Sequence, residues 1–132
     1  MEQKERMSIK DRTSVLVVND DANTRELMAT ALSDRYRCTT AASAEEAARL
    51  LAVAPFDVVI TDLIMPGASG IDLCHHVRKT CPTTAVLVVS VVYDDKARLE
   101  ALSSGACGFL TKPLDIADLE ANIEAALSPP RA

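Results

Sequence analysis

Aromatic side chains are scarce in this chain. It has two Phe, two Tyr and no Trp among 132 residues. A hydrophobic core must therefore be built mainly from Val, Leu, Ile and Ala. A single domain of this length can bury such a core without disulfides or a structural metal. The sequence thus predicts one globular domain rather than a small disulfide- or zinc-stabilised module.

Long apolar runs and an excess of positive charge are also missing. No stretch approaches the roughly 20 apolar residues that a membrane span needs. The charged start at residues 1–6 lacks the apolar region of a signal peptide. The formal net charge of −5 argues against direct nucleic-acid binding, because such domains usually carry a basic patch. We expect a cytoplasmic protein that binds neither membranes nor nucleic acid directly.

Cysteine motifs for metal binding or redox chemistry are absent. The four cysteines form no CxxC pair and have no zinc-type spacing; they are Cys38, Cys74, Cys81 and Cys107. We interpret them as reduced, mostly buried thiols. His75 and His76 are interpreted as surface residues of a helix, since no third ligand lies near them in the sequence.

Strand-like and helix-like stretches alternate along the chain. Short runs typical of strands occur at residues 15–18, 36–41, 57–61, 85–89 and 107–110. Helical spacing of apolar residues follows each run, at residues 24–32, 43–53, 69–79, 94–104 and 115–127. Ser43 and Glu46 match a capping box, and Gly105 is the expected C-cap of the fourth helix.

Strict alternation of strands and helices implies a parallel sheet with right-handed crossovers. The first, third and fourth strands are the most apolar, so the second and fifth are expected at the sheet edges. This pattern predicts an α/β, flavodoxin-like (βα)₅ fold, a doubly wound five-stranded sheet with strand order 2-1-3-4-5. The repeat covers residues 14–127, between a charged arm at 1–13 and a tail or linker stub at 128–132.

Polar side chains occur where the predicted strands end. The first strand runs into Asn19, Asp20 and Asp21, and the third runs into Asp62 just before a Pro-Gly break. The carboxyl ends of parallel strands share one edge of the sheet, where ligands of open α/β folds bind. We therefore expect the acids after the first strand to lie close to Asp62.

The fourth and fifth strands add a hydroxyl and an ammonium group at this edge, from Ser90 and Lys112. Clustered carboxylates repel one another unless a hard cation lies among them, and oxygen ligands with open positions suit Mg²⁺. A carboxylate can accept a phosphoryl group, provided that the phosphoryl oxygens are positioned and neutralised. Lys112 can pair with one phosphoryl oxygen and Ser90 can donate to another. These residue types predict Asp62 as the acceptor.

These motifs resemble those of the receiver domain of bacterial two-component response regulators, of the CheY-like type. The matching stretches occur in the family's order over about residues 14–127: residues 15–21, residues 58–70, Ser90 and residues 105–113. The resemblance implies that a sensor histidine kinase or a phosphotransfer protein supplies a phosphoryl group from phosphohistidine to Asp62. It also implies a signalling module rather than an enzyme.

The resemblance further implies a set of metal ligands. Mg²⁺ would contact Asp20, Asp62 and the backbone carbonyl of Ile64. Asn19 or Asp21 would be candidates for a contact through water.

A second implied group of residues responds to the phosphoryl group. Ser90 and Lys112 would contact it, and Ser90 and Phe109 would act as the switch. The Lys112-Pro113 peptide bond would be cis. The fourth helix, fifth strand and fifth helix would form the output face, directed to a downstream protein, to a fused output domain or to a second copy in a homodimer.

Two departures from the family pattern support an alternative. Asn19 stands where the family usually has an acid, which weakens Mg²⁺ binding. Val91 follows Ser90 where the family prefers Ala or Gly, which narrows access to the phosphoryl site. The alternative is a degenerate receiver that acts as a phosphorylation-independent protein-interaction module. An enzyme fits worse: there is no P-loop motif, and haloacid-dehalogenase-type phosphatases need a second Asp where Ile64 stands.

Overall fold

The structure is a computed structural model that describes residues 13–91 and 94–127. The predicted charged arm, apart from Thr13, and the predicted tail at 128–132 lie outside the described residues. Within the described part of the chain, no helix is long and apolar enough to cross a membrane.

Five parallel strands form one sheet in the order β2-β1-β3-β4-β5, which confirms the predicted flavodoxin-like topology. The strands are β1 (Ser14–Val18), β2 (Arg37–Ala41), β3 (Val58–Asp62), β4 (Ala85–Ser90) and β5 (Gly108–Thr111). The helices are α2 (Ala22–Leu32), α3 (Ala44–Val53), α4 (Gly70–Thr80), α5 (Asp95–Ser103) and α6 (Ile116–Leu127).

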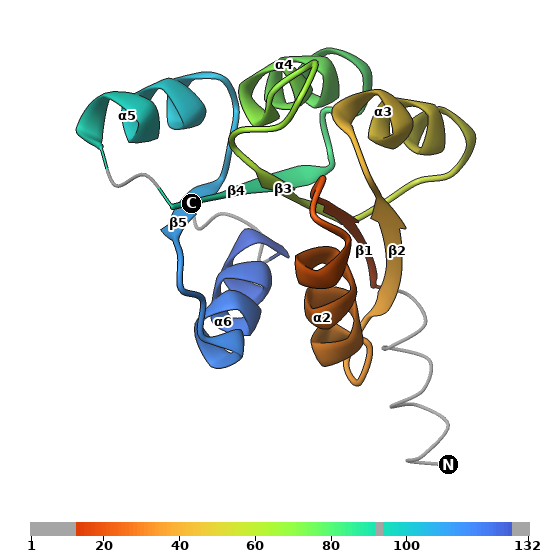
Figure 1. Ribbon diagram of the computed structural model, residues 1–132. Coiled ribbons are helices and arrows are strands. Elements are labelled where there is room, and N and C mark those ends of the chain that lie inside the picture. Colours follow the sequence, from red (N-terminus) through yellow and green to blue (C-terminus); the bar gives the residue numbers. More distant parts are fainter. Residues whose placement is uncertain (1–12, 92–93, 128–132) are drawn as a thin grey trace, which may run out of the picture.

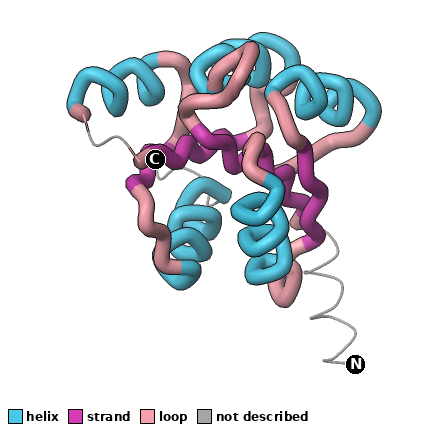
Figure 2. Tube along the Cα trace, in the orientation of Figure 1, coloured by secondary structure: helices cyan, strands magenta, loops and turns pink. Residues whose placement is uncertain are grey.

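Helices cover both faces of the sheet. Figure 1 shows α3, α4 and α5 on one face and α2 and α6 on the other, and the trace in Figure 2 shows the same three layers. Successive side chains of a strand point to opposite faces, so β1 contributes to two cores. Leu16 and Val18 pack into the core under α3, α4 and α5. Val15 and Val17 pack into the core under α2 and α6.

Three strands extend one residue beyond their predicted ends, because backbone pairing continues there. Asp62 is the last residue of β3 and pairs with Val89. Ser90 is the last residue of β4 and pairs with Thr111 of β5. The polar residues that the sequence placed just after the strands therefore belong to the sheet, which restricts their backbone positions.

The predicted capping box at Ser43 is only half formed. Ser43 Oγ accepts a hydrogen bond from Glu46 N at 3.0 Å, but Glu46 Oε1 accepts from Ala42 N at 2.7 Å instead of from Ser43. The cause is the extended backbone of Ser43, with φ −156°. At Ser69, where φ is −88°, the reciprocal box with Asp72 is complete.

The end of α5 and the burial of the cysteines also differ from expectation. Ser104 is the C-cap of α5, and Gly105 follows it at φ +115°.

All four cysteines are free, but only Cys74 is buried, while Cys107 is exposed. The prediction of mostly buried thiols is wrong for Cys107, which lies in the connection to the edge strand β5, whereas Cys38 and Cys81 are half-buried. Burial raises the pKa of the Cys74 thiol to about 12.

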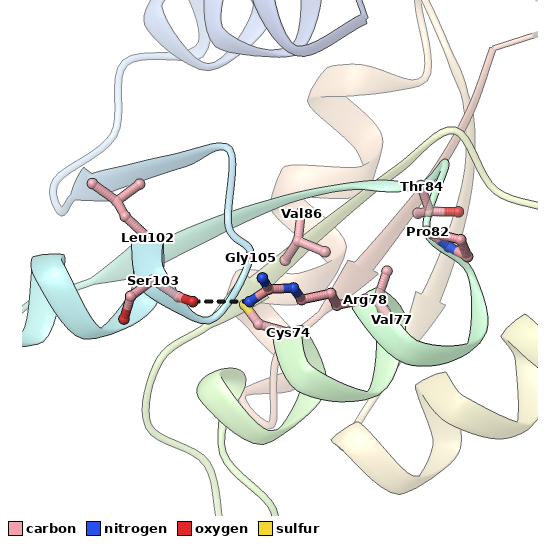
Figure 3. A pocket seen from close by; sticks show the side chains of 9 residues that line it. All are labelled: Cys74, Val77, Arg78, Pro82, Thr84, Val86, Leu102, Ser103 and Gly105. Atoms are coloured by element: carbon pink, nitrogen blue, oxygen red, sulfur yellow. Dashed lines mark hydrogen bonds between the residues drawn. The ribbon is translucent and has the colours of Figure 1, made fainter.

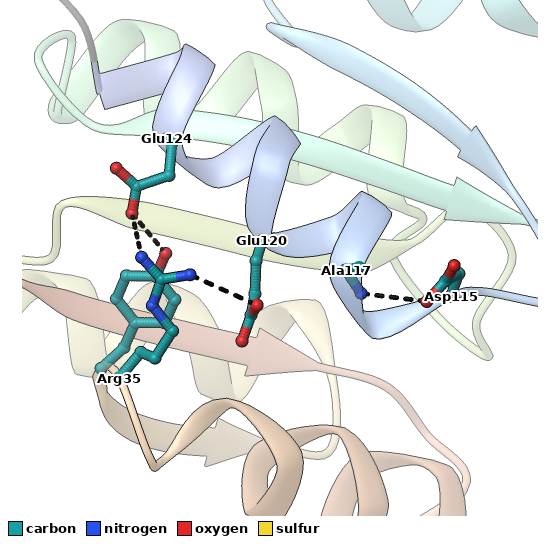
Figure 4. A network of polar contacts seen from close by, with 6 residues as sticks. Arg35, Asp115, Ala117, Glu120 and Glu124 are labelled. Carbon is teal, nitrogen blue, oxygen red and sulfur yellow. Dashed lines mark hydrogen bonds and ion pairs between the residues drawn. The ribbon is translucent and has the colours of Figure 1, made fainter.

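A polar network ties α6 to the turn that enters β2 (Figure 4). The Tyr36 hydroxyl donates to Glu124 Oε2 at 2.7 Å. The Arg35 guanidinium pairs with Glu120 at 3.3 Å and with Glu124 at 3.4 Å. Together they link the second strand to the last helix across more than eighty residues of sequence.

Candidate functional site

The predicted site residues come together at the carboxyl edge of the sheet. Asp62 and Ser90 end neighbouring strands. Lys112 follows β5, and its backbone N–H donates to the Ser90 carbonyl at 2.8 Å. Asp20 lies in the turn after β1, the strand on the other side of β3. The topology thus gathers residues from four separate stretches of sequence around Asp62.

An ion pair joins two of these side chains. Lys112 Nζ lies 3.3 Å from Asp62 Oδ1, and the two side chains are 25% and 15% exposed. The Lys112-Pro113 peptide bond is cis, as the resemblance implied. The partly shielded position strengthens the attraction relative to that of a fully solvated pair. Lys112 is therefore held where it can neutralise a negative charge that develops on Asp62.

The three polar residues after β1 have different surroundings. Asn19 is buried at 4% exposure, and its Oδ1 accepts from Asp21 N at 2.8 Å. Asp21 is the N-cap of α2 and accepts from Thr24 N at 2.8 Å and from Thr24 Oγ1 at 2.6 Å. Asp20 is exposed and makes no side-chain hydrogen bond within the described part of the chain. Asp20 is thus the carboxylate left available for a cation.

Hydrogen bonding lowers the pKa of the Asp21 carboxyl. The Thr24 side chain contributes most, followed by the Thr24 backbone N–H, and the charges of Lys112 and Arg25 act in the same direction. Arg25 also donates from Nη1 to the Asn19 carbonyl at 2.8 Å. Two side chains that the sequence analysis did not single out, Thr24 and Arg25, therefore hold this turn. The Asp-x-x-Thr spacing at a helix start is the signal that could have indicated Thr24.

The loop after Asp62 carries Ile64, whose side chain is 63% exposed, whereas Met65 is buried. Within the described residues, the Ile64 carbonyl accepts no hydrogen bond. The loop then enters α4 at Gly70, which packs directly against the Asp62 backbone. A Cβ added at Gly70 would clash with the Asp62 carbonyl oxygen, so a residue without a side chain is needed here.

The two predicted switch residues lie on neighbouring strands. Ser90 is buried at 2% exposure, while the adjacent Val91 is 71% exposed. Phe109 in β5 is half-buried and packs against the core under α3, α4 and α5. Thr61, which the sequence analysis did not single out, is fully buried, and its hydroxyl donates to the Asp62 carbonyl at 3.0 Å.

The oxygen donors at this edge fit Mg²⁺ better than a transition metal. Among the residues that the structure describes, no group of three or more His, Cys, Asp or Glu side chains could hold a metal ion. Mg²⁺ usually needs only one or two carboxylates, because it keeps several waters and binds substrate phosphate oxygens. Asp20 and Asp62 supply two carboxylates at this edge of the sheet.

A separate cavity of about 260 Å³ lies between α4, β4 and α5. Figure 3 shows Arg78 extending across it to α5, where Arg78 Nη1 donates to the Ser103 carbonyl at 3.0 Å. Thr84, which precedes β4, lines the cavity, so the cavity lies toward the opposite edge of the sheet. None of the predicted site residues lines it.

Comparisons with known proteins agree with this arrangement. A family model, "Response regulator receiver domain", matches residues 15–124. The response regulator protein PilR of Pseudomonas aeruginosa is 35% identical over 88% of this chain and 26% of its own length. The sensor histidine kinase TmoS of Ectopseudomonas mendocina is 33% identical over 89% of this chain and 12% of its own length. This chain thus spans a small part of each relative.

A solved structure is also similar. The chemotaxis protein CheY4 of Vibrio cholerae superposes with a TM-score of 0.82 at 30% identity, covering 87% of this chain and 98% of that one. The similarity thus covers most of this chain and nearly all of the other.

Proposed function

Because this chain belongs to the family of response regulator receiver domains of two-component systems, we propose that it accepts a phosphoryl group on Asp62. The donor would be a phosphohistidine of a sensor histidine kinase or of a phosphotransfer protein. The observation that carries the proposal is the half-buried Asp62 carboxylate, 3.3 Å from the Lys112 ammonium group at the carboxyl edge of the sheet. Receiver domains are signalling modules rather than classical enzymes.

The proposed transfer uses Asp62 as the nucleophile. An Asp62 carboxylate oxygen attacks phosphorus as the phosphorus–nitrogen bond breaks, and the bonding electron pair returns to the imidazole of the donor. The product is an aspartyl phosphate. Lys112 moves from the Asp62 carboxylate to a phosphoryl oxygen, and the Ser90 hydroxyl donates to another. Both groups already lie at this edge of the sheet, at the ends of neighbouring strands.

Receiver domains generally use Mg²⁺, and the donors present here suit it. We propose Asp20, Asp62 and the Ile64 carbonyl as its direct ligands, with Asn19 or Asp21 as partners through water. When bound, the cation supplies positive charge that neutralises the phosphoryl oxygens. Asp21 is also engaged in capping α2, so Asp20 is the principal ligand from the turn after β1.

The proposed output surface consists of α5, β5 and α6. Ser90 and Phe109 would couple phosphorylation to this face. The face would then bind a downstream protein, a fused output domain or a second copy of the chain. α5 suits such a role because Ala101 is its one buried residue, so little packing resists its movement.

The proposal can be tested with acetyl phosphate or carbamoyl phosphate and Mg²⁺, with intact mass as the readout. We expect the wild-type chain to gain one phosphoryl group and Asp62→Asn to gain none. Asp118→Asn, at an exposed position in the first turn of α6, is a control for loss of one carboxylate and should behave like wild type. If the folded wild-type chain gains no phosphoryl group, the phosphorylation-independent interaction module is favoured instead.

A further inference from the structure

The loop between Asp62 and α4 is anchored firmly at both ends. Leu63 N donates to the Val89 carbonyl at 2.9 Å, and Gly70 N donates to the Leu63 carbonyl at 2.9 Å. Next to Ile64, Met65 is buried at 6% exposure. Ile64 therefore lies between two residues that are held by the core, Leu63 before it and Met65 after it.

The middle of the loop has one flexible position. Pro66 has a nearly fixed φ. Gly67, however, lies at φ +80°, a conformation that glycine adopts easily and also leaves easily. Movement at Gly67 would change the direction of the chain between the buried Met65 and the start of α4. Because only Pro66 separates Gly67 from Met65, a restraint on Gly67 also limits how far the peptide group between Ile64 and Met65 can turn.

Glu45 from α3 supplies that restraint. Its Oε2 accepts a hydrogen bond from Ala68 N at 3.1 Å. Within the described residues, this is the one hydrogen bond that ties residues 64–68 to another element.

The carboxylate of Glu45 also lies against Gly67 itself. A Cβ added to Gly67 would be 3.1 Å from Glu45 Oε2 and 3.5 Å from Oε1. Glu45 therefore occupies the space that a side chain at position 67 would fill. It contacts the flexible residue and bonds to the next one.

We propose that Glu45 is a positioning residue for the phosphoryl-transfer site. By holding Gly67 and Ala68 in place, it keeps the Ile64 backbone where its carbonyl can serve as a Mg²⁺ ligand. The inference rests on the proposed function, because it assigns a role in the same site. It adds α3, which contributes no residue to the predicted site, to the elements that set the metal affinity.

Glu46 offers a matched control for the charge of Glu45. The two residues are neighbours in the first turn of α3 and carry the same charge. Glu46 bonds to Ala42 at 2.7 Å and makes no hydrogen bond to the loop after Asp62. A long-range electrostatic effect on Mg²⁺ would be similar for the two glutamates, whereas a positioning effect would belong to Glu45 alone.

The test is a Mg²⁺ titration followed by amide chemical shifts in NMR spectra, together with the rate of phosphorylation by acetyl phosphate at increasing Mg²⁺. We expect Glu45→Ala to raise the half-saturating Mg²⁺ concentration about three- to tenfold. Glu46→Ala should change it by less than about twofold, since exposed charges are screened. Glu45→Gln should restore most of the affinity, because its amide oxygen can accept the same bond. At saturating Mg²⁺ the maximal rate should stay close to that of wild type.

The outcomes separate this inference from the proposed function. An unchanged Mg²⁺ midpoint in Glu45→Ala, or equal shifts in Glu45→Ala and Glu46→Ala, would overturn the positioning role while wild-type phosphorylation stands. A wild-type chain that shows neither Mg²⁺-dependent shifts nor phosphoryl gain would overturn the proposed function, and this inference with it. Because Glu45 is exposed, Glu45→Ala and Glu45→Gln should leave the fold intact. A circular dichroism melting curve can verify this.

Discussion

In the turn after β1, the side chains of Asn19 and Asp21 make structural hydrogen bonds, whereas the Asp20 carboxylate makes none within the described residues. Asn19, buried, accepts from the Asp21 backbone, and Asp21 caps α2 through Thr24. Of these three residues, Asp20 is the one whose side chain makes no hydrogen bond or ion pair within the described part of the chain. The Asn19 side chain is turned into the protein, where its amide oxygen makes this structural hydrogen bond.

The cap at Asp21 predicts a pH-dependent contribution to stability. The folded-state pKa of Asp21 is lowered, so its stabilisation is complete above the unfolded value of about 3.9 and is lost as pH falls through the folded value. We expect Asp21→Ala to lower the urea midpoint at pH 7, and the difference from wild type to shrink below about pH 4. Asp34→Ala, at an exposed position after α2, is the control for loss of one carboxylate and should leave the urea midpoint at pH 7 close to that of wild type. A difference that persists unchanged at low pH would contradict the capping role.

Helix α4 is the element that most directly constrains Asp62. Its N-cap Ser69 forms a complete capping box with Asp72, and its first residue, Gly70, packs on the Asp62 carbonyl. The helix therefore begins beside Asp62 without space for a side chain between them. The approach of a helix start to a strand end sets the length and shape of the loop that carries Ile64.

Substitution of Gly70 tests this close approach. Within a helix, Gly→Ala normally stabilises by about 1 kcal/mol. Here the added Cβ would clash with the Asp62 carbonyl oxygen, so we expect Gly70→Ala to destabilise by about 1–3 kcal/mol. Urea unfolding monitored by circular dichroism gives the value. Asn23→Ala, at an exposed position near the start of α2, serves as a control for helix propensity. A stabilised Gly70→Ala variant would show that α4 can shift away from Asp62.

At the scale of the whole molecule, two hydrophobic cores are separated by the sheet, and polar contacts link distant parts of the chain. Arg35 and Tyr36, before β2, bond to Glu120 and Glu124 of α6. This network ties α6 to the segment between α2 and β2. Since α6 is part of the proposed output face, the network also fixes one side of that face.

The bond between Tyr36 and Glu124 predicts a further stability effect. Burial, followed by the hydrogen bond to Glu124, raises the pKa of Tyr36 well above 10. The protonated hydroxyl therefore stabilises the fold fully below about pH 10, and this contribution is lost as pH rises toward the folded value. We expect Tyr36→Phe to destabilise by about 1 kcal/mol at pH 7, measured by urea unfolding. An equal stability of the two proteins at pH 7 would contradict a net role for this bond.

Much of the fold could be predicted because it depends on local patterns. Apolar runs indicated all five strands, helical spacing indicated all five helices, and relative hydrophobicity placed β2 and β5 at the edges. The errors occurred where neighbouring strands or backbone angles decide. The strand ends at Asp62 and Ser90 depend on pairing with an adjacent strand. The bond of Glu46 to Ala42 depends on the φ of Ser43.

By itself, the sequence determined the strand order and the set of polar residues at the carboxyl edge. Hydrophobic periodicity and the rules of parallel sheets lead to both. Only the tertiary structure decided which of these side chains touch. Lys112 bonds to Asp62, Asn19 turns inward, and Glu45 reaches the loop at Ala68. These contacts depend on how helices and loops pack on the sheet, and the spacing of residues along one segment carries no information about that packing.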